Sequence, residues 1–123
     1  MVIVDTSVWI DHFRRGRSSL ATLLDDSMAF IHPFVAGELA CGNLANRKEI
    51  MGLLRKLPQA PRATDEELLY FIEARDLMGR GVGLVDMHLL ASTKLRDDLV
   101  LWTRDKRLHN LATELSVAFQ AGV

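Results

Sequence analysis

The stretch VIVDTSVW, residues 2–9, determines how the rest of the chain is interpreted. Its first three residues are β-branched and apolar, which favours a short strand. A continuous apolar run, unlike an alternating one, indicates a strand covered on both faces, as in parallel sheets. Asp5 follows this run directly, and an amphipathic segment begins after it. The stretch therefore predicts a buried parallel strand with a carboxylate at its carboxyl end.

Further short apolar runs are spaced along the chain, and helical patterns separate them. Apolar residues recur at helical spacing at 50–57 and 87–95. Thr64 and Glu67 form a capping-box signature ahead of another apolar run. The expected strands are Val2–Val4, Met28–Ile31 and Leu99–Trp102, with weaker ones at Val117–Phe119 and at Pro61–Ala63, where proline limits the segment to an edge or a strand start.

Strands that alternate with helices predict an α/β domain with a central, mainly parallel sheet covered by helices on both sides. Ligands of such folds bind outside the carboxyl ends of the strands. Asp5 is therefore expected at the ligand-binding edge of the sheet.

The composition is that of an ordinary globular protein, with 49% hydrophobic and 25% charged residues. A chain of 123 residues fits one domain, residues 1–123, with a core of its own. The net charge of −1 means that attraction for nucleic acid must come from local clusters of cations. The single cysteine, Cys41, excludes an internal disulfide and favours a cytoplasmic location. No apolar run approaches the roughly 20 residues that span a bilayer, and no secretory signal is visible.

Four of the 16 acidic residues stand in or beside apolar segments. Each has an ordinary structural explanation: Asp86 and Asp105 as helix-start residues, Glu38 as a solvent-facing residue, and Asp5 as an acceptor for the N–H groups of the following helix. The four are Asp5, Glu38 within GELACG (37–42), Asp86 within GLVDMHLLAS (83–92), and Asp105 after the apolar run in LVLWTRD (99–105).

If the four acids converge on one cleft, together they can bind a metal ion. Close carboxylates repel one another and resist joint ionisation, and a hard divalent cation removes that repulsion. Oxygen-only ligands favour Mg²⁺ or Mn²⁺ over zinc. Such an ion lowers the pKa of bound water and stabilises charge on a phosphodiester. The pattern therefore predicts metal-dependent hydrolysis of a phosphate ester.

The segments VIVDTSVWID, GELACG, GLVDMHLLAS and LWTRDKRL, in this order and spacing, resemble the PIN-domain ribonucleases, and most closely the VapC-type toxins of toxin–antitoxin pairs. The resemblance covers essentially the whole chain. It implies a three-layer α/β/α sandwich, Mg²⁺- or Mn²⁺-dependent endonucleolytic cleavage of RNA, a homodimer, and inhibition by a cognate antitoxin that lays a C-terminal segment across the active-site groove.

The same resemblance implies roles for particular residues. Thr6 matches the family's small hydroxyl residue after the first aspartate, and Thr103 matches its threonine before the last acid. Both are expected to orient carboxylates by hydrogen bonding. The four catalytic and metal-ligating acids fall on Asp5, Glu38, Asp86 and Asp105.

Two clusters of cations flank this pattern. An acidic metal centre needs a cationic rim to attract a polyanion, so the clusters are candidates for RNA contact; an ordinary solvated face is the alternative. They consist of Arg14, Arg15 and Arg17, and of Arg104, Lys106 and Arg107.

Several other residues are given ordinary structural roles. We expect Asp11 to be solvated, His88 to be a surface or interface histidine, and Cys41 to be packed as a small residue. The GRGVG segment (79–83) lacks a phosphate-binding spacing and is expected to form a turn that leads to Asp86. Trp9 and Trp102 are expected to fill the core or the sheet–helix interface.

Other function classes fit the sequence less well. A flavodoxin-like receiver needs adjacent acids after the first strand, and a haloacid-type phosphatase needs an acid two residues after Asp5, where the chain has Ser7. A non-catalytic PIN-like module that binds protein or RNA stays open as the alternative. Metal-dependent RNA cleavage distinguishes it from a nuclease.

Overall fold

The structure is a computed structural model, and it describes residues 1–16 and 19–120. Its central strand is β1 (Val2–Val4), which is buried along its whole length. β1 pairs in parallel with β2 (Ala29–Phe30) on one side and with β3 (Val100–Trp102) on the other, so the strand order is β2-β1-β3. The prediction of a mainly parallel sheet is confirmed.

The two weaker strand predictions have different outcomes. Val117–Phe119 contributes a single parallel bridge, at Ala118, beside β3. The weak strand expected near Pro61–Ala63 is displaced to the residues just before it: Gln59 forms a single parallel bridge with Ile31, and the N–H of Ala60 donates to the carbonyl of Ile31 at 2.9 Å. Proline has no N–H to donate, so the ladder does not continue through Pro61.

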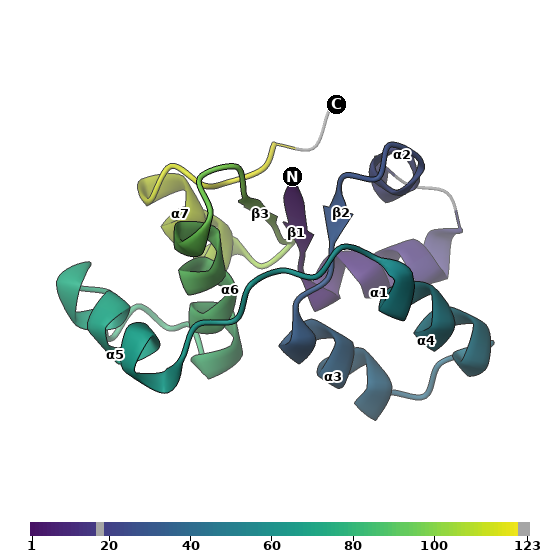
Figure 1. Cartoon of the computed structure of the whole chain (residues 1–123), viewed down its shortest axis with the longest axis horizontal. Coiled ribbons are helices and arrows are strands. Elements are labelled where there is room, and N and C mark those ends of the chain that lie inside the picture. The colour runs from purple at the N-terminus through teal and green to yellow at the C-terminus, as the bar shows by residue number, and fades with distance from the viewer. Residues whose placement is uncertain (17–18, 121–123) are drawn as a thin grey trace.

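The described residues form seven helices, which pack around the sheet in two groups. Figure 1 shows α1–α4 on the side of β2 and α5–α7 on the side of β3. This arrangement confirms the predicted α/β sandwich. The helices are α1 (Thr6–Arg15), α2 (Ser19–Asp25), α3 (Pro33–Cys41), α4 (Arg47–Lys56), α5 (Asp65–Ala74), α6 (Leu84–Leu95) and α7 (Lys106–Glu114).

Capping residues explain where several of these helices begin. The side chains of Asp5, His32 and Asp105 accept hydrogen bonds from backbone N–H groups at the starts of α1, α3 and α7. The capping box predicted for Thr64 and Glu67 is present at the start of α5, with both reciprocal hydrogen bonds made. Each cap satisfies N–H groups that a helix leaves without partners.

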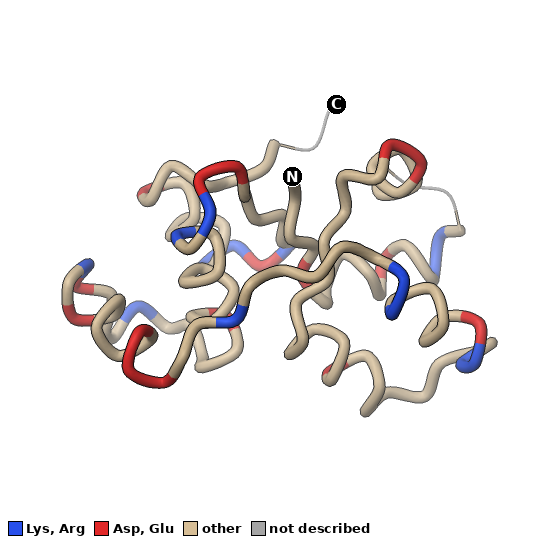
Figure 2. Tube along the Cα trace, viewed as in Figure 1, with Lys and Arg blue, Asp and Glu red and all other residues tan. Residues whose placement is uncertain are grey.

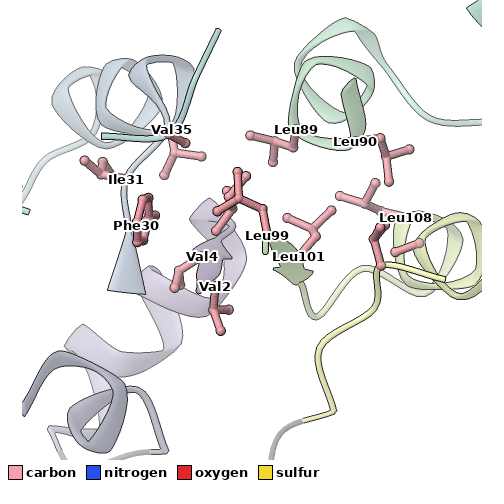
Figure 3. Packing of buried hydrophobic residues seen from close by; sticks show 14 of the residues in the cluster. Val2, Val4, Phe30, Ile31, Val35, Leu89, Leu90, Leu99, Leu101 and Leu108 are labelled. Atoms are coloured by element: carbon pink, nitrogen blue, oxygen red, sulfur yellow. The ribbon is translucent and has the colours of Figure 1, made fainter. Parts of the chain in front are cut away.

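The core lies between the sheet and the helices that cover it, as Figure 3 shows. Ile3 of β1, Leu101 of β3 and Leu89 of α6 are fully buried. Trp9 is also fully buried, which confirms its predicted place in the core. Cys41 is exposed at the end of α3, so the prediction that it packs inside is wrong.

Helix α6 is buried through its middle, from Met87 to Thr93. His88 lies in this run with only 2% of its surface exposed, and its ring meets the ring of Phe34 edge-on at 4.6 Å. The prediction of a surface or interface histidine is wrong, because α6 is covered both by β3 and by α5. None of the helices in the described part of the chain has the length and apolar character needed to cross a membrane.

Candidate active site

The register of the sheet places the ends of β1 and β3 side by side. Val4 pairs with Trp102, and the N–H of Asp5 donates to the carbonyl of Trp102 at 2.9 Å. Parallel strands end at the same edge of a sheet, so the residues that follow them meet there. Asp105 follows this edge by three residues and caps α7, accepting from the N–H of Leu108 at 2.9 Å. The capping explanations for Asp5 and Asp105 are both correct.

Asp5 is held by three hydrogen bonds and is 6% exposed. Its Oδ1 accepts from the N–H of Thr6 at 2.8 Å. Its Oδ2 accepts from the hydroxyls of Ser7, at 2.8 Å, and Thr103, at 2.7 Å. An ionised carboxylate offers about four acceptor positions. The position left over is on Oδ1, and a cation bound by Asp5 would therefore be held through one oxygen.

The two hydroxyls tie Asp5 to the loop between β3 and α7. Ser7 Oγ also accepts from the N–H of Arg104 at 3.1 Å, and Thr103 Oγ1 accepts from the N–H of Asp105 at 3.1 Å. Sequence reasoning missed the part played by Ser7. The signal was present, since a hydroxyl in the first turn of a helix lies within reach of the capping carboxylate.

Glu38 comes to the same edge from α3, which packs against α1. The hydroxyl of Thr6 donates to Glu38 Oε1 at 2.6 Å, so Thr6 contacts two of the four acids, Asp5 through its N–H and Glu38 through its hydroxyl. Glu38 is exposed, as its ordinary explanation predicts. Its Oε2 accepts no hydrogen bond from the described residues, which leaves that atom available to a ligand.

Asp86 lies at the third position of α6, after the glycine turn at 79–83. Gly79 and Gly81 have positive φ angles of 71° and 81°, which glycine adopts without strain. Gly83 then caps α6 and forms a backbone hydrogen bond with the Asp86 carboxylate. The predicted turn is therefore present, and it sets the start of the helix that carries Asp86.

The electrostatics of Asp86 connect the four acids. Burial, together with the charges of Asp5, Asp105 and Glu38, raises the pKa of Asp86 to about 6, and the backbone hydrogen bond from Gly83 partly opposes this shift. Carboxylates influence one another in this way only when they lie close together. The fold therefore brings these four predicted residues, far apart in the sequence, into one acidic cluster.

The fit of a metal to this cluster rests on donor chemistry. All four side chains are oxygen donors, the set that suits Mg²⁺ or Mn²⁺. Within the described residues, however, no three His, Cys, Asp or Glu side chains are arranged to hold one ion as they stand. Mutual repulsion opposes their closer approach, and a divalent cation would offset it. The four side chains therefore fit a hard cation in their donor chemistry, although among the described residues their positions do not form a ready-made site.

The basic residues predicted to surround the acidic cluster differ in whether they form ion pairs or hydrogen bonds with other residues. Arg104 Nη1 lies 3.4 Å from Asp11 Oδ2, and Arg15 Nε donates to Asp11 Oδ1 at 2.9 Å. Asp11 is partly exposed, which agrees with the expectation that it is solvated, and it also links α1 to the loop before Asp105. Arg107 packs its guanidinium against Gly81. Arg14 and Lys106 are exposed and form no ion pair within the described residues; Arg17 lies outside those residues.

A cavity of about 810 Å³ opens between α1, the end of α3 and the start of α4. Glu38 lines it at the acidic cluster, and Ile10, Phe13 and Leu44 supply apolar surface. The acidic cluster therefore borders a groove whose lining is partly apolar and partly polar.

Comparisons with known proteins agree with this architecture. The family model described as PIN domain matches residues 2–114. The chain is 46% identical over 118 residues to Ribonuclease VapC32 of Mycobacterium tuberculosis, in strain CDC 1551 / Oshkosh and likewise in strain ATCC 25618 / H37Rv. Each match covers 96% of this chain and 95% of the relative.

Proposed function

This chain belongs to the PIN domain family, and we propose that it is a metal-dependent endoribonuclease that acts as the toxin of a toxin–antitoxin pair. Its relatives, identical at 46% of positions along nearly their whole length, are named ribonucleases of the VapC type. The single observation that carries the proposal is the acidic cluster, in which Thr6 contacts both Asp5 and Glu38, and burial together with the other three carboxylates raises the pKa of Asp86.

The proposed roles follow from the contacts at the cluster. Asp5, Glu38, Asp86 and Asp105 would hold a divalent cation, which supplies an activated water and stabilises charge on the scissile phosphodiester when it is bound. Thr6, Ser7 and Thr103 orient the carboxylates through the hydrogen bonds described above. Such outer hydrogen bonds fix the direction of a ligand's lone pairs.

The choice of Mg²⁺ or Mn²⁺ is a finer proposal. Both ions favour carboxylate oxygen, and the cluster contains no nitrogen or sulfur donor that would select a softer ion. We expect either ion to support cleavage and zinc to support it poorly.

We propose that the RNA approaches over the cations beside the cluster. Figure 2 shows basic segments in both groups of helices, and the net charge of the chain is −1. Attraction must be local, at residues beside Asp105. Arg104, on the loop between β3 and α7, and Lys106, at the start of α7, are exposed. Arg14 and Arg15 stand at the end of α1. Arg107 and Arg17 belong to the same proposal.

The partners of the protein belong to the proposal as well. A cognate antitoxin would inhibit the enzyme by covering the acidic cluster, and the groove that Glu38 lines offers an apolar surface for such a segment. We further propose that residues 1–123 form one nuclease domain, that the domain forms a homodimer, and that it acts in the cytoplasm.

Cleavage of RNA by the purified protein, with and without Mg²⁺ or Mn²⁺, tests the proposal. The parent protein should cut single-stranded RNA internally when either ion is present and should stop when the ion is chelated. Asp86→Asn should lower the rate at least a hundredfold, because one ligand loses its charge. Asp25→Asn is the matched control, since Asp25 ends α2 on the exposed surface, and its rate should equal that of the parent.

The binding-module alternative predicts a different result. A protein that binds RNA or its antitoxin saturably, and leaves RNA intact in both metals at every concentration tested, would be such a module. Asp5→Asn gives a second check, because it removes charge while retaining an acceptor for the α1 cap. Full cleavage by that variant would end the assignment of the four acids.

A further inference from the structure

We propose that a hollow beside the loop between β3 and α7, the Trp102 hollow, binds one nucleotide of the RNA through its base. The proposal rests on the proposed function, since it takes RNA as the substrate. The hollow has a volume of about 360 Å³, which suits one nucleotide better than a folded peptide segment. The residues that carry the argument are Trp102, Arg104, Lys106, His109, Asn110 and Phe119.

One wall of the hollow is aromatic and firmly held. The rings of Trp102 and Phe119 lie 5.3 Å apart, tilted by 50°. Trp102 is the last residue of β3, and the N–H of Phe119 donates to the carbonyl of Leu101 at 2.9 Å. Both residues are only partly buried. The wall therefore presents aromatic surface to solvent on a rigid support, the arrangement on which unstacked bases pack.

The rest of the lining is polar and cationic. His109 and Asn110 come from α7, one half-buried and the other exposed, and they offer a third ring and an amide. An amide both donates and accepts, so it can pair with the edge of a base. Lys106 stands in the same lining and forms no ion pair within the described residues. Aromatic surface combined with a free cation matches a nucleotide, which joins a base to a phosphate.

The position of the hollow connects it to the acidic cluster. Thr103 lines the hollow, and its hydroxyl donates to Asp5 Oδ2 at 2.7 Å. Arg104 also lines it, and its N–H donates to Ser7. The loop 103–105 therefore lines the hollow through Thr103 and Arg104, contacts Asp5 and Ser7, and carries Asp105 itself. A base in the hollow would hold a nucleotide flanking the phosphodiester at the cluster, and would help to set which bond is cut.

Fluorescence of the two tryptophans tests this proposal directly. Trp9 is fully buried, so Trp102 is the tryptophan that a bound base can reach. The experiment uses the full chain with Asp86→Asn, which binds without cutting, and a five-nucleotide single-stranded RNA. We expect the RNA to change the emission of Trp102 as it binds. Removal of the base at one position of the RNA should weaken binding about tenfold, the scale of one base–aromatic stack.

Variants of the lining extend the test. Affinity measured by the anisotropy of a labelled RNA should fall about tenfold for Trp102→Leu and severalfold for Asn110→Ala, in proteins whose thermal unfolding remains cooperative. Tyr70→Leu is the matched control, because Tyr70 is an aromatic residue of α5 with 75% of its surface exposed. It should bind RNA as the parent does.

Two results would overturn the proposal. One is equal affinity for the intact RNA and for every abasic counterpart; the other is an unchanged Trp102 emission at saturating RNA. Its failure is distinguishable from failure of the proposed function. A protein that cleaves RNA but ignores the missing base retains the function without the subsite. A protein that reads the base but does not cleave retains the subsite without the function.

Discussion

The two carboxylate oxygens of Asp5 both stabilise the fold and fix the position of Asp5 in the acidic cluster. It caps α1 through Oδ1 and binds two hydroxyls through Oδ2. These bonds hold the carboxylate in one orientation, which leaves little freedom to be lost when a cation binds. A carboxylate is therefore tolerated at the end of a buried strand, because three hydrogen bonds stabilise its charge.

Ser7 gives a prediction at the residue scale. Ser7→Ala removes one hydrogen bond to Asp5 and the acceptor for the N–H of Arg104. We expect Mn²⁺ affinity, measured by calorimetry, to fall about tenfold, within the range for outer-shell partners of metal ligands. The free energy of unfolding should fall by about 1–2 kcal/mol.

A hydroxyl that lies away from the four acids provides the control for Ser7→Ala. Thr113 on α7 donates its hydroxyl to the carbonyl of His109 at 2.9 Å and touches none of the four acids. Thr113→Ala should leave Mn²⁺ affinity as in the parent. Equal affinities for Ser7→Ala and the parent would contradict the role given to Ser7.

Asp86 gives a second prediction at this scale. Its pKa is raised to about 6 by burial and by the other three acids, so its charged form is disfavoured in the folded protein. Asp86→Asn removes that charge and retains an acceptor for Gly83. In chelator at pH 7, urea unfolding should show an increase of about 1–3 kcal/mol in the free energy of unfolding. The stabilisation that Mn²⁺ gives to the parent should disappear in this variant.

The reverse outcome has a clear meaning. A lower stability for Asp86→Asn in chelator would show that the carboxylates do not repel one another in the folded state. Asp25→Asn again serves as the control, because this carboxylate is exposed at the end of α2, and its free energy of unfolding should match that of the parent.

At the scale of elements, α3 depends on a neutral histidine. His32 is fully buried, and its Nδ1 accepts from the N–H of Phe34 at 3.0 Å to cap the helix that carries Glu38. Burial lowers the pKa of His32 to about 4, assisted by His88 and Arg62. His88 is buried beside His32. Burial and the charge of Arg62 lower the pKa of His88, and the charge of Asp65 only partly opposes this shift. A protonated His32 would lose the acceptor that makes the cap.

The sign of the resulting pH dependence follows from linkage. Between pH 6.5 and about 4 the unfolded chain binds a proton at His32 and the folded protein does not, so stability falls as the pH falls through this window. We expect His32 to contribute a loss of about 2–3 kcal/mol in the free energy of unfolding across it. Asp86 acts in the opposite sense between pH 6 and 3.8, because its folded pKa is raised.

His32→Asn tests the origin of this loss. Asparagine provides a capping oxygen that does not titrate, so urea midpoints of this variant should vary less between pH 6.5 and 4 than those of the parent. His109→Asn replaces a half-buried histidine on α7 that caps no helix, and its pH profile should follow the parent's. Identical profiles for His32→Asn and the parent would refute the assignment.

For the molecule as a whole, the balance of charge shapes how RNA is bound. The net charge is −1, so the salt dependence of binding should arise from a few local cations. Arg104→Gln together with Lys106→Gln should reduce the slope of log affinity against log salt by about 1.4, since each contact to a single strand contributes roughly 0.7. Fluorescence anisotropy across a salt series measures this slope.

The control pair lies at the end of α4. Arg55 and Lys56 are exposed there and form no ion pair within the described residues. Their replacement by glutamine should leave the slope as in the parent. A slope that both pairs reduce equally would mean that RNA is attracted by the total charge of the protein.

The sequence alone was enough to predict the α/β class, the three strands and the caps of α5 and α1. These features depend on residues close together in the chain, whose spacing is visible in the sequence. The four acids could also be singled out as candidates, because Asp5 directly follows β1, Asp105 follows β3 by three residues, and Glu38 and Asp86 interrupt apolar helices. Short strands at the sheet edges were less predictable, since a single bridge such as Ala118 leaves almost no local pattern.

Only the tertiary structure decided which distant residues contact one another. Thr103 meets Asp5 across 98 positions of the chain, and the N–H of Arg104 meets Ser7 across 97. The burial of His88 and the lining of the Trp102 hollow likewise depend on which helices cover which side. No local pattern encodes these contacts, because they exist only when parallel strands bring distant segments to the same edge of the sheet.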